Sequence, residues 1–153
     1  MKILVSACLL GENCKYSGGN NYNQTVCVFA RGHQVVPVCP EVLGGLSTPR
    51  CPAEIVQGVV TNKEGINVDR EFRAGAAKAL AIAKENGVEL AILQSRSPSC
   101  GVKEIYDGTF SGTKIPGQGV FAKMLMDEGV RVLDAGELPK IILKNEDGKC
   151  QSN

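Results

Sequence analysis

The chain has 153 residues, with 17 basic and 16 acidic side chains and a formal net charge of +1. This balance excludes the broad positive field of a basic nucleic-acid-binding or membrane-binding scaffold. The length suits one domain with a substantial core, so we expect a single domain over residues 1–138 and a polar tail over residues 139–153. No run approaches the roughly 18 apolar residues of a membrane-spanning helix, and we expect a cytoplasmic protein.

Seven cysteines are many for this length, and their odd number disfavours a disulfide framework. Residues 5–8 imitate a lipoprotein cleavage box, but too few apolar residues precede Cys8 to form a signal-peptide core. Cytoplasmic thiols are kept reduced. Several thiols in such a setting indicate metal or redox chemistry.

The first half of the chain predicts two buried strands that are separated by a loop and a short helix. In chain order we expect a strand over residues 2–7, a loop over 13–23, a helix over 24–31 with Gly32 as its C-cap, and a strand over 34–38. The first strand leads into Cys8 and the second into Cys39. Pro40 prevents a simple continuation of the second strand.

The second half predicts a hairpin followed by alternating helices and strands. We expect hairpin strands over residues 55–61 and 66–68 around a turn at 62–65, a helix from the N-cap Asp69 to Asn86, a strand over 90–93, a loop over 94–119, a helix over 120–128 and a strand over 130–133. Gly87 and Gly129 end the two helices. The alternation predicts an α/β fold with an open, mainly parallel, Rossmann-like sheet of about four strands in the order 2-1-3-4, flanking helices and a small hairpin insertion.

Three cysteines follow three different predicted strands. Cys8 follows the first strand, Cys39 the second, and Cys100 lies a few residues past the third. Because ligands bind beyond the carboxyl ends of the strands in such sheets, we expect these thiols to meet at one edge. Three thiolates can hold a cubane iron–sulfur cluster, or a zinc ion with an open position. Either metal centre leaves one coordination site for a substrate.

Polar residues accompany these cysteines. Glu41 lies two residues after Cys39, where it could act as a general acid or base, or simply be a solvated loop acid or a helix cap. Residues 95–101 place three hydroxyls, a cation and a thiol after a buried strand. The hydroxyls could orient water, donate to cluster sulfides or bind a polar ligand, or cap the next turn. Gly44 and Gly45 permit either a close backbone approach or a plain turn.

The other cysteines and the single histidine are weaker candidates. Cys14 is close enough to Cys8 in sequence to support the same site, as an alternative ligand or sulfur relay, or to be an inert loop thiol. We expect Cys27 to be a core residue and Cys150 to be incidental, and Cys51 is left open. His33 is interpreted as a turn residue, so catalysis by a histidine triad is not expected.

Four segments together resemble the thiouracil desulfurase family. They are residues 6–11 (SACLLG), 38–46 (VCPEVLGGL), 48–50 (TPR) and 95–101 (SRSPSCG). The resemblance extends from residue 1 to about residue 138. One departure is Cys51, which stands where the family pattern has proline, and this argues against Cys51 as a required ligand.

The resemblance implies a [4Fe-4S] cluster that is bound by only three cysteines and whose fourth iron captures the sulfur of a thiolated base without net redox change. Carried over by position, the ligands are Cys8, Cys39 and Cys100, with Cys14 as an alternative ligand. The catalytic residues implied are Glu41 and Ser97. Longer relatives act on thiolated transfer RNA through an additional domain, so here we expect a small thiolated pyrimidine, as free base or nucleotide, and no stable nucleic-acid partner.

Two other functions compete with this interpretation. The first is a non-catalytic protein that senses metal or redox state through zinc or its thiols, which would be colourless. The second is a cluster-dependent enzyme that adds sulfur to a nucleotide. The chain has no GxxxxGK[ST] loop to bind the ATP that would activate a base oxygen, which disfavours the second alternative.

Overall fold

A computed structural model of the chain describes residues 1–138, and its main sheet has four parallel strands in the order β2-β1-β5-β8. The strands are β1 (Lys2–Ser6), β2 (Gln34–Val38), β5 (Leu90–Leu93) and β8 (Arg131–Asp134). The predicted α/β class and the predicted 2-1-3-4 order are confirmed, and no strand end differs from its prediction by more than one residue. The predicted tail, residues 139–153, lies outside the described residues.

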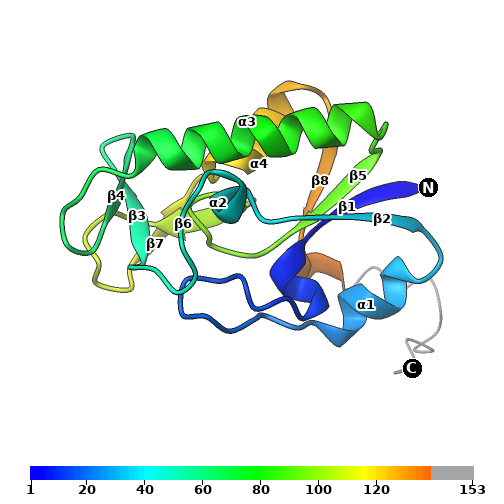
Figure 1. Cartoon of the computed structure of the whole chain (residues 1–153), viewed down its shortest axis with the longest axis horizontal. Helices are drawn as coiled ribbons and strands as arrows, with labels where there is room; N and C mark the ends of the chain where they lie inside the picture. The colour runs from blue at the N-terminus through cyan, green and yellow to red at the C-terminus, as the bar shows by residue number, and fades with distance from the viewer. Residues whose placement is uncertain (139–153) are drawn as a thin grey trace.

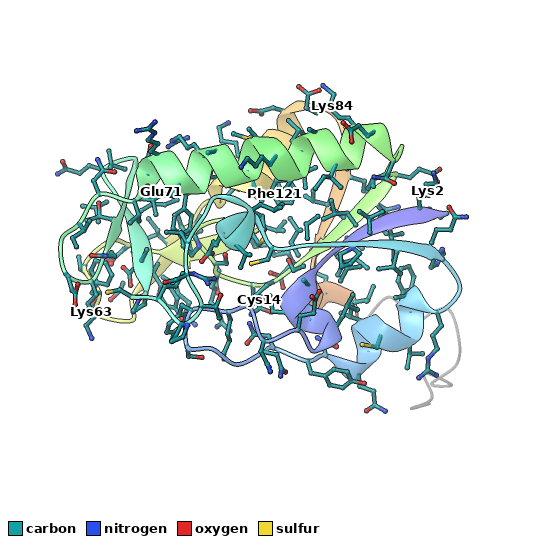
Figure 2. All side chains as sticks on the ribbon, in the orientation of Figure 1. Lys2, Cys14, Lys63, Glu71, Lys84 and Phe121 are labelled. Carbon is teal, nitrogen blue, oxygen red and sulfur yellow. The ribbon has the colours of Figure 1, made fainter. Side chains whose placement is uncertain are left out.

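Helices cover both faces of the main sheet (Figure 1). The helices α3 (Asp69–Glu85) and α4 (Val120–Asp127) lie on one face, and α1 (Gln24–Ala30) lies on the other. Side chains alternate along β1, so that Leu4 packs with α3 and α4 while Ile3 and Val5 pack with α1. Figure 2 shows Phe121 of α4, which is fully buried, between α3 and the sheet. No helix within residues 1–138 is long and apolar enough to cross a membrane.

Two predicted helix caps are wrong. The C-cap of α1 is Arg31 rather than Gly32, because the chain turns through a bond from the His33 N–H to the Ala30 carbonyl (3.0 Å). The N-cap of α3 is Val68, and Asp69 lies in the first turn. The Asp69 carboxylate accepts the Val60 N–H (3.0 Å), so it ties α3 to a strand instead of capping its own helix.

The predicted hairpin insertion is present, but its turn lies elsewhere. It consists of β3 (Ala53–Val56) and β4 (Val59–Asn62), joined by Gln57 and Gly58, which have φ values of +50° and +82°. Two left-handed residues match the twist of a two-residue hairpin turn. The predicted turn at residues 62–65 also forms, yet beyond it only a single bridge pairs Thr61 with Asn67.

A second antiparallel pair, which the sequence interpretation missed, lies within residues 94–119. It comprises β6 (Glu104–Tyr106) and β7 (Lys114–Pro116). Strands of three residues are too short to show a periodic pattern. This pair lies next to the β3–β4 hairpin at one end of the molecule (Figure 1).

A short helix after β2 places part of the site. This helix, α2 (Pro40–Leu43), begins at a proline, which is favoured at the first helical position. It packs against α3 so closely that an added Cβ at Gly75 would collide with the Pro40 carbonyl, and one at Gly44 with the Glu71 carbonyl. The close backbone approach considered for Gly44 is therefore confirmed. Because Cys39 is the N-cap of α2, this contact also places Cys39 and Glu41.

Candidate metal centre and active site

A cavity of about 490 Å³ lies at the carboxyl ends of β1, β2 and β5. Its lining includes every residue that the sequence nominated for the site, namely Cys8, Cys14, Cys39, Cys100, Glu41 and Ser97. Residues that follow three different strands therefore meet beyond the carboxyl ends of the strands, where parallel sheets of this kind bind their ligands.

Each of the three strand-end cysteines is held by a different local structure. Cys8 is in the 3-10 helix η1 (Ala7–Leu10), directly after β1, and is 9% exposed. Cys39 is the N-cap of α2. Cys100 is 4% exposed and lies in a loop that the first N–H groups of α4 hold in place, since Val120 and Phe121 donate to the carbonyls of residues 98 and 99.

Cys14 joins the same cavity from the loop after η1, where Figure 2 labels it. The thiol of Cys39 donates to the Cys14 carbonyl at 3.8 Å. The Arg50 guanidinium donates to the same carbonyl at 2.8 Å. The structure thus brings Cys14 to the other three thiols, and its role as an alternative ligand stays a prediction.

Burial and mutual charge make these thiols poor acids in the protein alone. Burial raises the pKa of Cys100 to about 12, and the charges of Glu41 and Cys8 add to this although Ser6 and Ser99 donate hydrogen bonds that oppose it. Burial also raises the pKa of Cys14 to about 12, with Cys39 as a further cause. The pKa of Cys8 is raised by burial and lowered in part by the Asn21 amide, which donates to its sulfur at 3.4 Å. Metal binding would supply the positive charge that stabilises such crowded thiolates.

Glu41 uses its two carboxylate oxygens for different partners. Oε1 accepts from Nε of Arg50 (3.0 Å) and lies 2.9 Å from Nη2 of the same guanidinium. Oε2 accepts from Ser99 Oγ at 2.8 Å and from Ser97 Oγ at 3.5 Å. The side chains of Arg50 and Glu41 are only 8% and 14% exposed, so this ion pair is largely removed from water.

The two serines have different surroundings. Ser97 Oγ accepts the N–H groups of Ser99 and Cys100, each at 3.0 Å, and therefore shapes the loop that carries Cys100. Ser99 Oγ lies 2.8 Å from Ser97 Oγ and is within reach of the Cys100 sulfur at 3.7 Å. Ser99 thus links Ser97, Glu41 and Cys100.

Sequence reasoning missed three of these groups: Arg50, Ser99 and Asn21. Arg50 lies in the TPR segment of residues 48–50, and membership of that segment is the signal that could have found it. Ser99 is one of three hydroxyls in residues 95–101, and the resemblance singles out Ser97 instead. Asn21 lies in a loop rich in asparagine, and nothing in the sequence marks it.

The remaining candidates have other environments. Cys51 lines the cavity as well. Cys27 is half-buried on α1, where its thiol donates to the Leu9 carbonyl at 3.8 Å. His33 forms the predicted turn before β2, at the amino ends of the strands and away from the cavity. Its ring packs on Phe29, with the ring centroids 4.8 Å apart. Cys150 lies outside the described residues.

Within residues 1–138, no three His, Cys, Asp or Glu side chains are grouped tightly enough to share one metal ion. A cubane cluster does not need such a group, because each of its protein thiolates binds a different iron. An all-sulfur donor set around a roomy cavity fits a cluster, and the six cysteines in this part of the chain are all free.

The fold and the site define an α/β enzyme whose cavity combines strand-end thiols with a carboxylate and hydroxyls. The sequence profile of the 2-thiouracil desulfurase family matches residues 3–137. The chain belongs to this family, which confirms the resemblance and the expectation of an enzyme.

Two similar proteins cover nearly the whole chain. The uncharacterized protein YbbK of Bacillus subtilis (strain 168) is 43% identical over an alignment of 150 positions, which covers 92% of this chain and 99% of that protein. A solved structure of the [4Fe-4S]-dependent thiouracil desulfidase TudS is 39% identical, with a TM-score of 0.84 over 94% of this chain and 97% of that one. The fold is therefore shared with an iron–sulfur enzyme.

Proposed function

We propose that the protein hydrolyses the carbon–sulfur bond of 2-thiouracil, or of a related thiolated pyrimidine base or nucleotide, with a [4Fe-4S] cluster as cofactor. The observation that carries the proposal is the single cavity in which three strand-end thiols meet Glu41 and its serine partners. Family membership and the similarity to TudS support it. We place the reaction in the cytoplasm, where these free thiols stay reduced.

Cys8, Cys39 and Cys100 would hold the cluster, since each follows a different strand of the sheet and all three line the cavity. Three protein ligands leave one iron open, and this soft metal site would accept a thiocarbonyl sulfur and make the attached carbon more electrophilic. The Asn21 amide, which donates to the Cys8 sulfur, and the Ser99 hydroxyl, which lies 3.7 Å from the Cys100 sulfur, would orient these ligands and tune them.

Glu41 is the proposed general base. Arg50 holds one oxygen of its carboxylate, which leaves the other oxygen directed at the hydroxyls of Ser97 and Ser99. From this position the carboxylate takes a proton from water as the water attacks the thiocarbonyl carbon. Ser97 orients that water or passes the proton, and its own hydroxyl is oriented by the loop N–H groups that it accepts.

The overall reaction balances without an oxidant or a reductant. The oxygen of water forms the new carbonyl bond, the carbon–sulfur bond breaks, and sulfur leaves as hydrosulfide. Uracil is the product when 2-thiouracil is the substrate. Neither electrons nor ATP are consumed.

The decisive experiment is turnover of 2-thiouracil in oxygen-18 water by anaerobically prepared protein. The protein should be brown, with about four irons and four acid-labile sulfides per chain. One oxygen-18 atom should enter each uracil, and neither a reductant nor ATP should be required. A colourless, zinc-loaded protein, when iron and sulfide are supplied, would contradict the proposal, as would a strict need for a reductant.

Glu41→Gln tests the general base within the same assay. The substitution keeps the size of the side chain but removes its ability to take a proton, so the rate should fall by roughly two orders of magnitude. Cluster absorption should remain. Glu64→Gln, at an exposed acid that does not line the cavity, is the matched control and should retain full activity. A full-rate Glu41→Gln enzyme would remove Glu41 from the mechanism.

A further inference from the structure

A second part of the cavity lining comes from the small antiparallel strands rather than from the main sheet. Tyr106 at the end of β6, Phe110 in the loop between β6 and β7, and Glu54 on β3 all line the same cavity as the cysteines. Phe110 is half-buried there. None of these residues belongs to the thiol and carboxylate machinery described above.

Glu54 holds the loop that carries Phe110. Its Oε1 accepts the N–H of Gly108 at 2.9 Å and the N–H of Phe110 at 3.1 Å. The loop also presses directly against β3, since an added Cβ at Gly108 would lie 2.7 Å from the Ile55 carbonyl oxygen. The Asp107 N–H donates to the Thr113 carbonyl (2.9 Å) and closes the loop.

Phe110 has a backbone conformation that bulky residues seldom adopt, with φ at +56°. Such a conformation persists only where surrounding contacts impose it. Here the Glu54 carboxylate imposes it through the Phe110 N–H itself. The hydrogen bonds from this loop to Glu54 on β3 therefore hold Phe110 in the cavity wall, although its backbone conformation is unfavourable.

We infer that Phe110, positioned by Glu54, forms the aromatic surface on which the pyrimidine ring of the substrate stacks. This inference rests on the proposed function and adds to it the group that recognises the ring. A flat heterocycle gains binding energy by stacking on an aromatic side chain without any hydrogen bond that would depend on its substituents.

Binding of uracil to the cluster-loaded protein, measured by calorimetry, tests the stacking surface. Uracil has the same ring but no sulfur, so its binding does not depend on turnover. Phe110→Leu should weaken uracil binding about tenfold, the scale for losing one stacked base, and raise KM for 2-thiouracil by a similar factor with little change in kcat. Phe110→Tyr should recover most of the lost affinity because it restores the ring. Ser111→Ala is the control. The Ser111 hydroxyl pairs with the hydroxyls of Thr109 and Thr113 in the same loop, so this variant should bind uracil as tightly as the unaltered protein does.

The positioning role of Glu54 is tested by a double-mutant cycle. Glu54→Ala should lose as much uracil affinity as Phe110→Leu, and the double variant should lose little more, because both changes remove the same interaction. Glu54→Gln keeps an oxygen acceptor for the two N–H groups and should bind several-fold more tightly than Glu54→Ala. Visible absorption of the cluster verifies that each variant is folded and loaded.

Several results would overturn the inference. They are undiminished uracil binding by Phe110→Leu, fully additive losses in the double variant, a loss in Glu54→Gln equal to that in Glu54→Ala, or no uracil binding by the unaltered protein. A protein that binds uracil through Phe110 but releases no sulfur from 2-thiouracil would instead refute the proposed function and leave the ring-binding surface standing.

Discussion

At the scale of single residues, the buried ion pair of Arg50 and Glu41 connects two parts of the cavity lining. The guanidinium contacts one carboxylate oxygen and also donates to the Cys14 carbonyl, so one cation joins Glu41 to the loop that carries Cys14. Both side chains are largely buried. Removing one partner of such a pair leaves an uncompensated charge in a medium that solvates it poorly.

Arg50→Met should therefore lower the stability of the cluster-loaded protein by about 3 kcal/mol, the low end for breaking a buried ion pair. For a chain of this length that corresponds to a fall in Tm of roughly 6–12 °C. The double variant Arg50→Met/Glu41→Gln should regain more than half of the loss because the orphaned charge is gone. Arg73→Met, which removes the exposed pair with Asp69, is the control and should cost less than about 1 kcal/mol. Equal Tm values for the single and double variants would contradict the argument.

The cysteines make a second prediction at this scale. Replacement of Cys8, Cys39 or Cys100 by serine should each abolish cluster retention, because a weaker oxygen ligand replaces a thiolate. Cys27→Ser is the control, since Cys27 lies on α1 and does not line the cavity. The measurement is iron and acid-labile sulfide per chain after anaerobic purification. If Cys14→Ser loses the cluster while one of the other three variants retains it, the ligand assignment is wrong although the enzyme class could stand.

At the scale of elements, the short helix α2 depends on its neighbour. A single turn gains little stability by itself, because forming the first turn orders several residues for one hydrogen bond. Its place is set by the close contact of residues 40–44 with Gly75 of α3. The position of this helix therefore sets the positions of two site residues, Cys39 as its N-cap and Glu41 in its first turn.

Gly75→Ala should separate α2 from α3, although alanine is the better helix former by about 1 kcal/mol. Overpacking of a tight contact costs about 1–3 kcal/mol, so we expect a lower Tm together with reduced desulfuration as Cys39 and Glu41 shift. Gly32→Ala is the control, because nothing lies within 4 Å of its added Cβ and its φ is not positive. A Gly75→Ala protein with full activity and a raised Tm would show that α2 is not placed by this contact.

At the scale of the whole molecule, the proposed metal centre borders the core and shares Cys8 and Cys100 with it. Two clusters of buried side chains lie on the two faces of the main sheet, and they contain the large residues of β1, β5, α3, α4 and α1. Cys100 belongs to one cluster and Cys8 to the other, but most members of both clusters are apolar side chains that do not line the cavity. The fold therefore has enough buried apolar surface to form without its cofactor, unlike small metal-dependent domains.

Removal of the cluster by chelation and oxidation, followed by reduction of the thiols, should leave the far-ultraviolet circular dichroism spectrum nearly unchanged. The unfolding midpoint should fall, because a cofactor that binds only the folded state stabilises that state. Rebuilding the cluster with iron and sulfide should restore the midpoint. Loss of helical signal on removal would contradict the proposal that the core folds independently.

Local patterns were enough to predict the main sheet but not the small strands. The runs at β1 and β5 are apolar throughout, as buried parallel strands must be, and they lie where the sequence predicts them. The sequence predicts the hairpin turn at residues 62–65, which have turn composition, whereas the chain turns at Gln57 and Gly58. The position of the turn follows from the pairing of β3 with β4, in which Ala53 lies opposite Asn62. Such pairing depends on two segments together, so neither segment shows a periodic sequence pattern that would reveal it.

The sequence by itself determined the class of fold, the strand order and the meeting of Cys8, Cys39 and Cys100, because each depends on buried runs and on where those runs end. Tertiary structure alone decided which groups face Glu41 and Phe110. The bonds from Arg50 and Ser99 to Glu41, and from Phe110 to Glu54, join loops and strand ends that are distant in the chain. Hydrogen bonds of this kind depend on the direction of individual side chains, which neither composition nor periodicity specifies.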